Sequence, residues 1–217
     1  MTHISAGERV LAVTARPGQE SADLGGVLYA FRRMGASLAL LSLTRGEASP
    51  LNSTCQRLEA VRPWELQLAA SVLGISSVTV ADYPDGGLCR YPTAELTGRV
   101  RRAIREHEPD LVLVIDPADG NLDDTVVATA ICNAAVQAGL PVAARTTVAA
   151  RASWVIDLGA EAATARTLQR SAVAAHASQA DAVPHLRHQL DALDGREYLR
   201  WLVPRYQSSP RKLLAAA

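Results

Sequence analysis

The sequence is poor in residues that would mark several classes of protein. It has three cysteines, Cys55, Cys89 and Cys132, which lie far apart and form no Cys-x-x-Cys pair. Such a set argues against a disulfide framework or a structural zinc site and favours a reducing, cytoplasmic environment. No apolar run is long enough to span a bilayer, and the polar residues 1–9 do not resemble a signal peptide.

An excess of charge of one sign is also missing. Lysine plus arginine and aspartate plus glutamate number 22 each, so the formal net charge is zero at pH 7. A balanced chain has no general attraction to nucleic acid or to an anionic membrane, and we expect neither as a partner. The 217 residues suffice for one sizeable core, so we predict a single domain over 1–217 with a frayed tail over about 208–217.

Short apolar runs alternate with longer helical patterns along the chain. The runs that we expect as buried strands are 10–14, 38–43, 78–81, 111–115 and 153–157. The segments that we expect as helices are 22–34, 63–73, 93–107, 124–138 and 162–177, with Pro63 in a first turn. This alternation is typical of an α/β fold, in which a Rossmann-like, doubly wound and mostly parallel sheet carries helices on both faces.

In a sheet of this kind, ligands bind beyond the carboxyl ends of the strands. Four segments that follow predicted strands should therefore surround one crevice: residues 15–20, 44–47, 82–88 and 116–124. This expectation follows from the order of the elements alone.

Five motifs, in order, resemble those of the PIG-L/LmbE family of zinc-dependent deacetylases. Residues 10–26 resemble the family's first strand and Ala-His-Pro-Asp-Asp-Glu motif, followed by a Gly-Gly helix. Residues 43–47 (Leu-Thr-Arg-Gly-Glu) and 62–66 (Arg-Pro-Trp-Glu-Leu) resemble its Leu-Thr-x-Gly-Glu turn and Arg-x-x-Glu-Leu helix. Residues 83–86 (Tyr-Pro-Asp-Gly) and 175–179 (Ala-His-Ala-Ser-Gln) match two further motifs. The resemblance runs through nearly the whole chain and implies the same fold.

The resemblance implies hydrolysis of an acetamide, typically on N-acetylglucosamine, by zinc-activated water and a carboxylate base. Carried over by position, the family's zinc ligands fall at Arg16, Gln19 and Asp124. Its base falls at Gly18, and a histidine with a transition-state role falls at Asn121. Arginine has no lone pair, glutamine is a weak neutral ligand and glycine has no side chain. We therefore expect no zinc and no other cofactor, and we assign no catalytic residue.

Three hypotheses follow for the function. The leading one is a family member that has lost zinc-dependent N-acetyl-sugar deacetylation and acts as a pseudoenzyme, a binding or regulatory module. The alternative is an active N-acetylglucosaminyl deacetylase, or a related amide hydrolase, with an altered centre built from Glu20, Asn121, Asp123 and Asp124. The third is a structural partner with a vestigial crevice. Each is compatible with a homo- or hetero-oligomer.

A sugar or another polar small molecule is the expected ligand, because polar groups converge on the crevice. The predicted pocket consists of Arg16, Gln19, Glu20, Arg45, Glu47, Arg62, Asp85, Asp123 and Asp124. Arg16 either replaces the charge of the metal in a network with neighbouring carboxylates, or points to solvent or pairs locally at the end of the strand. Arg45, Arg62 and Asp85 either contact the ligand or form ordinary salt bridges and turns.

Residues 116–124 contain four aspartates and Asn121. Such an oxygen-rich segment suits Mg²⁺ or Ca²⁺, but it equally suits a polar loop followed by helix-capping carboxylates. His176 is expected to be a buried, hydrogen-bonded histidine. Other sites lack support, since the chain has no Gly-x-Ser-x-Gly elbow and no dinucleotide-binding glycine pattern around Gly25 and Gly26.

Overall fold

The computed structural model describes residues 8–50, 57–182 and 195–205. The strands are β1 (Arg9–Thr14), β2 (Ser37–Thr44), β3 (Ser77–Tyr83), β4 (Leu111–Ile115), β5 (Val142–Thr146), β6 (Trp154–Asp157) and β7 (Arg196–Val203). The α-helices are α1 (Gln19–Ala22), α2 (Gly25–Arg33), α3 (Leu58–Leu73), α4 (Thr93–His107), α5 (Leu122–Ala138) and α6 (Ala162–Ala175). Short 3₁₀ turns are η1 (Leu88–Arg90), η2 (Ala149–Arg151), η3 (Gly159–Glu161) and η4 (Ala177–Ala182).

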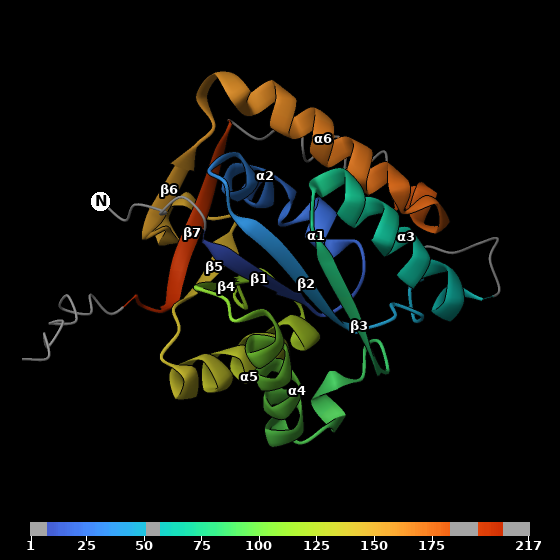
Figure 1. Ribbon diagram of the computed structural model, residues 1–217. Helices are drawn as coiled ribbons and strands as arrows, with labels where there is room; N and C mark the ends of the chain where they lie inside the picture. The colour runs from blue at the N-terminus through green and yellow to red at the C-terminus, as the bar shows by residue number, and fades with distance from the viewer. Residues whose placement is uncertain (1–7, 51–56, 183–194, 206–217) are drawn as a thin grey trace, which may run out of the picture.

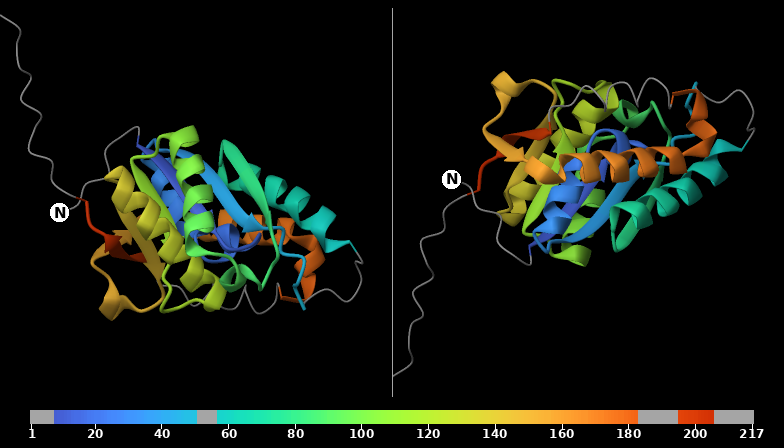
Figure 2. Two further views of the ribbon diagram at one scale, coloured as in Figure 1. Left: turned by 90° about the horizontal axis from the view of Figure 1, so that it is seen from below. Right: turned by 90° about the horizontal axis from the view of Figure 1, so that it is seen from above.

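The strands form one sheet in the order β3-β2-β1-β4-β5-β7-β6 (Figure 1). Strands β1 to β5 pair in parallel, and β7 runs antiparallel to both β5 and β6. Helices α2, α3 and α6 cover one face of the sheet, and α4 and α5 cover the other (Figures 1 and 2). The expected α/β fold with a doubly wound, mostly parallel sheet is therefore confirmed.

Strand β1 is the centre of the core. Leu11 and Val13 belong to the cluster on the α4–α5 side, whereas Val10 and Ala12 belong to the cluster on the α2–α3–α6 side. All four side chains are buried. A strand that is buried on both faces has no polar side, which is why its sequence is a continuous apolar run.

The position of the crevice follows from the order of the strands. Strand β1 pairs with β2 on one side and with β4 on the other. The chain visits β2 and β3 first and then crosses back to β4, so the crossovers beside β1 run in opposite directions. This arrangement leaves a crevice at the carboxyl ends of β1 and β4. The segments after those strands, 15–18 and 116–121, meet there.

Several expected boundaries differ from the structure. The predicted helix 22–34 corresponds to α2, which begins only at Gly25 and follows the separate short helix α1, and the predicted helix 162–177 ends as α6 at Ala175 before η4 begins. Strands β5 and β7 were not predicted, and the expected frayed tail lies outside the described residues.

Pro63 does not lie in a first turn. Helix α3 begins at Leu58, so Pro63 is inside the helix. Proline has no N–H group, and the carbonyl of Glu59 therefore lacks its usual helical donor. The Nη1 atom of Arg45 donates a hydrogen bond to that carbonyl at 3.4 Å, so a side chain from another segment compensates for the proline.

A buried ion-pair cluster joins α2, α6 and the antiparallel part of the sheet. Arg166 donates to Glu197 at 2.5 Å, and the Nε atom of Arg145 lies 3.6 Å from the same carboxylate. All three side chains are buried. A Cβ atom at Gly26 would overlap both the Glu197 carboxylate and the Arg166 guanidinium. Glycine is needed here because α2 approaches these charges closely.

We predict that Gly26→Ala lowers the free energy of unfolding by about 1–3 kcal/mol, because the added methyl group displaces tightly packed, buried charges. Gly98→Ala in α4 is the matched control. A Cβ atom there meets nothing within 4 Å, so alanine should stabilise the helix by up to about 1 kcal/mol. Urea unfolding of both variants tests this contrast, which fails if the two midpoints shift in the same direction.

Candidate functional site

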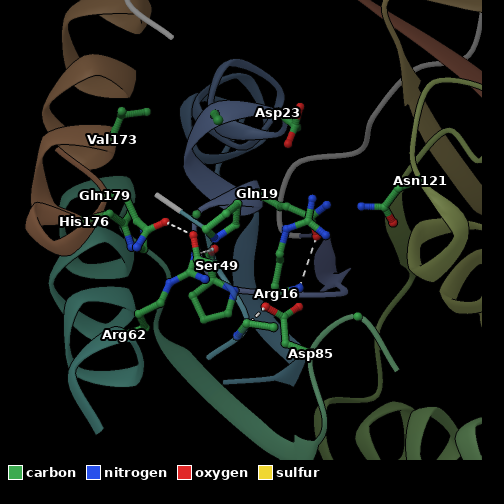
Figure 3. Close-up of a pocket in the computed structure, with 16 residues that line it drawn as sticks. Arg16, Gln19, Asp23, Ser49, Arg62, Asp85, Asn121, Val173, His176 and Gln179 are labelled. Carbon is green, nitrogen blue, oxygen red and sulfur yellow. Dashed lines mark hydrogen bonds between the residues drawn. The ribbon is translucent and has the colours of Figure 1, made fainter. Parts of the chain in front are cut away.

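A cavity of about 470 Å³ opens at the crevice (Figure 3). The residues that line it come from the β1–α1 turn, the loops after β2 and β3, helix α3, the start of α5 and the end of α6. Its polar lining includes Arg16, Gln19, Asp23, Arg62, Asp85 and Asn121. A second cavity of about 400 Å³ shares Arg16, Gln19, Asp23 and Asn121 with the first and adds Asp119 and Asp124.

Gln19 joins the end of β1 to the start of α5. Its Oε1 atom accepts hydrogen bonds from the backbone nitrogens of Ala15 at 3.0 Å and Arg16 at 3.2 Å. Its Nε2 atom donates to Oδ1 of Asp124 at 2.7 Å. Asp124 and Asn121 form a capping box at the N-terminus of α5, in which each side chain accepts from the backbone of the other. Both oxygens of Asp124 therefore accept hydrogen bonds from within the protein.

The donor set at these positions does not fit zinc. Arg16 offers no lone pair, and Gln19 directs its amide nitrogen, a donor, at the Asp124 carboxylate. Gly18 contributes no side chain. Within residues 8–50, 57–182 and 195–205, no group of three or more His, Cys, Asp and Glu side chains is placed to hold a metal ion. A zinc centre of the expected kind needs three such ligands.

The aspartates of segment 116–124 have separate partners rather than a common centre. Burial raises the pKa of Asp116, but the hydrogen bonds from Arg200 and from the backbone of Ala118, together with the charge of Arg200, outweigh burial and hold that pKa below its ordinary value. The partners are Arg200 for Asp116, Thr146, Thr147 and Arg151 for Asp119, the backbone nitrogens of Gly86 and Leu88 for Asp123, and Gln19 and Asn121 for Asp124. This geometry agrees with the interpretation of the segment as a polar loop followed by helix-capping carboxylates.

Glu20 is fully buried and holds the β1–α1 turn in place. Its Oε1 atom lies 2.7 Å from Nε2 of His176, and its Oε2 atom accepts from the backbone nitrogen of Gly18 at 2.8 Å. Burial raises the pKa of Glu20, but the attraction of His176, together with the hydrogen bonds from His176, Ser21 and the backbone, outweighs burial and leaves the pKa below its ordinary value. His176 is thus buried and hydrogen-bonded, as expected, and its ring also lines the cavity.

Arg62 is likewise occupied within the protein. Its side chain is buried and donates from Nη1 to the carbonyl of Gly46 and from Nη2 to the carbonyl of Pro17 at 2.6 Å. Gly46 has a φ of 72°, which favours glycine, and Arg62 lies against its open side. Arg62 therefore ties the loop after β2 to the β1–α1 turn at the wall of the cavity.

Four residues of the predicted pocket do not line either cavity: Glu20, Arg45, Glu47 and Asp123. Arg45 pairs with Asp82 at 2.5 Å as well as supporting the carbonyl of Glu59. Glu47 accepts from the backbone nitrogen of Asp85 at 2.8 Å. Each of these charged groups fixes a loop near the cavity instead of facing it.

Arg16 does not form the carboxylate network that we expected. Its backbone nitrogen donates to Gln19, but its guanidinium makes no hydrogen bond or ion pair with the described residues. The predicted partners are engaged elsewhere, Glu20 with His176 and Asp124 with Gln19. The alternative was a side chain that points to solvent or pairs locally at the strand end, and Arg16 is partly exposed and lines both cavities.

Asp23 is a site residue that the sequence reasoning missed. It lies between α1 and α2, is partly buried and lines both cavities, and its carboxyl makes no hydrogen bond or ion pair within the described chain. Burial raises the pKa of Asp23 to about 6, against the attraction of Arg145 and Arg16. The sequence did contain a signal for this residue. Asp23 is a carboxylate that lies just before Gly25 and Gly26 at the start of α2, in a turn that borders the crevice.

We predict that Asp23 makes the protein less stable as the pH rises from about 4 to 6. The pKa of Asp23 is about 6 in the folded protein and 3.8 in the unfolded chain. Between these two pH values, Asp23 still carries its proton in the folded protein but has lost it in the unfolded chain. The loss of folding stability caused by ionising Asp23 is therefore absent below pH 3.8 and complete above pH 6. Asp23→Asn removes this charge, so the variant should be more stable than the parent above pH 6, by up to about 2 kcal/mol after allowing for solvent screening.

Urea unfolding between pH 4 and pH 8 measures this effect. The exposed Asp157, replaced by asparagine, serves as the control and should keep the parent's dependence on pH. The prediction is wrong if Asp23→Asn shows the same change of stability across this window as the parent protein.

Comparisons with known proteins agree with this fold and crevice. The model of the PIG-L family, described as GlcNAc-PI de-N-acetylase, matches residues 11–135. The chain belongs to the PIG-L family of deacetylases, so the resemblance in its motifs is confirmed.

Curated relatives carry related names. The chain is 30% identical over 113 residues to the probable N-acetyl-α-D-glucosaminyl L-malate deacetylase 2 of Bacillus anthracis, covering 50% of each chain. It is 29% identical over 157 residues to the 1D-myo-inositol 2-acetamido-2-deoxy-α-D-glucopyranoside deacetylase of Rhodococcus erythropolis, covering 60% of this chain and 53% of that one. The chain thus spans about half the length of the curated relatives it matches.

Among solved structures, the N,N'-diacetylchitobiose deacetylase of Pyrococcus horikoshii has the same fold, with a TM-score of 0.69. Its sequence is 18% identical, and the match covers 90% of this chain and 84% of the other. None of the helices in the described part of this chain combines the length and the hydropathy that crossing a bilayer requires.

Proposed function

We propose that this PIG-L family chain is a pseudoenzyme that binds a polar ligand of the sugar class in its crevice and does not perform zinc-dependent deacetylation. The observation that carries the proposal is the hydrogen bond of 2.7 Å from Nε2 of Gln19 to Oδ1 of Asp124. By resemblance, both residues stand at positions of zinc ligands. In this contact Gln19 directs a hydrogen-bond donor, not a lone pair, at the Asp124 carboxylate, so it does not act as a second metal ligand beside Asp124.

The absence of a base supports the same proposal. The position of the family's base is Gly18, whose backbone has a φ of 99° and which offers no group that takes up a proton. A general base must lie within hydrogen-bond reach of the water it activates. Glu20 and Asp123 are neighbouring carboxylates, but neither lines the cavities, and both accept hydrogen bonds from the protein. The alternative of an active hydrolase with an altered centre therefore has less support.

The cavity supports a retained ligand. A volume of about 470 Å³ lies within the range of small-molecule sites, and its mixture of apolar and polar groups suits a ring with hydroxyl groups. The matched relatives are named for deacetylation of N-acetylglucosaminyl compounds, which favours a sugar as the ligand. The open cavity also favours a binding role over a vestigial crevice. The cytoplasmic location inferred from the scattered cysteines completes this proposal.

We predict that the purified chain, incubated with excess zinc and then dialysed, retains well under one zinc ion per molecule, because one carboxylate beside an arginine is not a zinc site. Metal analysis by mass spectrometry measures this. The same protein should release no acetate from N-acetylglucosaminyl malate or N-acetylglucosaminyl inositol, the compounds that the names of the relatives indicate.

The matched control is the variant Arg16→His, Gln19→Asp, Asp124→His, which restores the ligand types that the resemblance assigns. This variant should bind more zinc than the parent chain in the same assay. Stoichiometric zinc in the parent chain, or acetate release by it, would falsify the proposed loss of chemistry.

A further inference from the structure

The cavity contains two arginines with different surroundings. The guanidinium of Arg62 donates to the carbonyls of Gly46 and Pro17 and is held there. The guanidinium of Arg16 has no hydrogen-bonding or ionic partner among the residues that the structure describes. A partly desolvated cation without a hydrogen-bonded partner is costly, and such groups are concentrated at functional sites. Arg16 is therefore the cation that is available to a ligand.

Asn121 supplies a second donor beside Arg16. Its Oδ1 atom accepts from the backbone nitrogen of Asp124 at 3.1 Å, and this contact fixes which end of the amide is the nitrogen. Figure 3 shows this nitrogen turned toward Arg16 and the cavity. Gln19 holds the backbone of Arg16 by accepting its N–H at 3.2 Å. The guanidinium and the amide thus present N–H donors, on supported elements, to the same space.

Asp23 limits the charge that this space accepts. Its carboxyl faces the same two cavities and stands across from Arg16 in Figure 3. The charged groups that act on Asp23 are Arg145 of β5, Asp124 of α5, and Arg16 and Glu20 of the β1–α1 region. An ionised Asp23 opposes any anion in this space, but it opposes a doubly charged group about twice as strongly as a single carboxylate, which Arg16 attracts.

We propose that Arg16 and Asn121 form an anion subsite that binds a single carboxylate of the ligand, so that the ligand is a carboxylated sugar such as a hexuronic acid. This inference rests on the proposed function, in which the crevice binds a polar ligand. A guanidinium matches the planar geometry of a carboxylate with two parallel N–H donors. Arg16, which by resemblance stands where the family has a zinc-binding residue, would thus select small molecules that carry a negative charge.

Isothermal titration of the full chain with D-glucuronate, D-glucose and D-glucose 6-phosphate tests the subsite. The parent protein should bind glucuronate at least about tenfold more tightly than glucose, which corresponds to one charge-assisted hydrogen bond. Glucose 6-phosphate, which is largely doubly charged at pH 7.5, should bind more weakly than glucuronate. Equal affinities for glucuronate and glucose, or no glucuronate binding at millimolar concentration, would overturn the inference.

Variants separate the subsite from a general effect on folding. Arg16→Gln should lose about tenfold or more of the glucuronate affinity and keep the glucose affinity, and Arg16→Lys should lose less because it keeps the charge. Arg105→Gln is the matched control, since Arg105 is exposed on α4, lines neither cavity and should leave both affinities unchanged. Glucuronate affinity that is unchanged in Arg16→Gln overturns the inference.

The dependence on pH provides a second readout. Glucuronate affinity should rise as the pH falls from 8 to 5, because protonation of Asp23 removes the charge that opposes the carboxylate. Asp23→Asn should bind glucuronate with an affinity that changes little over this range. A rise of the same size in Asp23→Asn would contradict the role of Asp23. These results are independent of the zinc and acetate measurements, so a failure of the subsite is distinguishable from a failure of the proposed function.

Discussion

The crevice depends on the hydrogen bond between Gln19 and Asp124, which joins its two sides. Glutamine can make this connection because its oxygen accepts from two backbone nitrogens at the end of β1 while its nitrogen donates to the carboxylate on α5. A second carboxylate at position 19 could not donate and would leave two like charges side by side. The amide therefore closes the site by a charge-assisted bond, without a cation between the two elements.

The other charged groups near the cavity follow from this closure. Because Asp124 is satisfied by neutral donors, Arg16 is not needed as its counter-ion and is left facing the cavity. Glu20 pairs with His176, and Arg62 donates to backbone carbonyls of two loops. These groups form the frame around the site. Among the described residues, Arg16, Asn121 and Asp23 line both cavities and keep polar atoms for a ligand, which is the basis of the proposed binding function.

Parts of this arrangement could be predicted from the sequence, and the reasons differ between elements. Strands β1 and β4 are buried on both faces and are read directly as apolar runs. Strands β5 and β7 contain the charged residues Arg145 and Glu197, whose partnership is formed between distant segments and leaves no local pattern. The crevice was placed correctly by the order of strands and helices. The surroundings of Arg16 were not predicted correctly. The sequence suggested Asp124 as a partner for Arg16, but in the structure the Asp124 carboxylate accepts a hydrogen bond from the amide of Gln19.

The replacement at Arg16 changes what the same crevice can distinguish. A metal ion can polarise a neutral amide carbonyl and also activate a water molecule, whereas a guanidinium has no acidic water to offer and only donates hydrogen bonds. The energy that a guanidinium gains is greatest with an oxyanion, where two parallel N–H donors meet two oxygens. An ionised Asp23 opposite reduces that gain, and reduces it more for a doubly charged group than for a single carboxylate. In the binding function that we propose, the site would therefore select a carboxylate of an acidic sugar instead of the acetyl group of a neutral one.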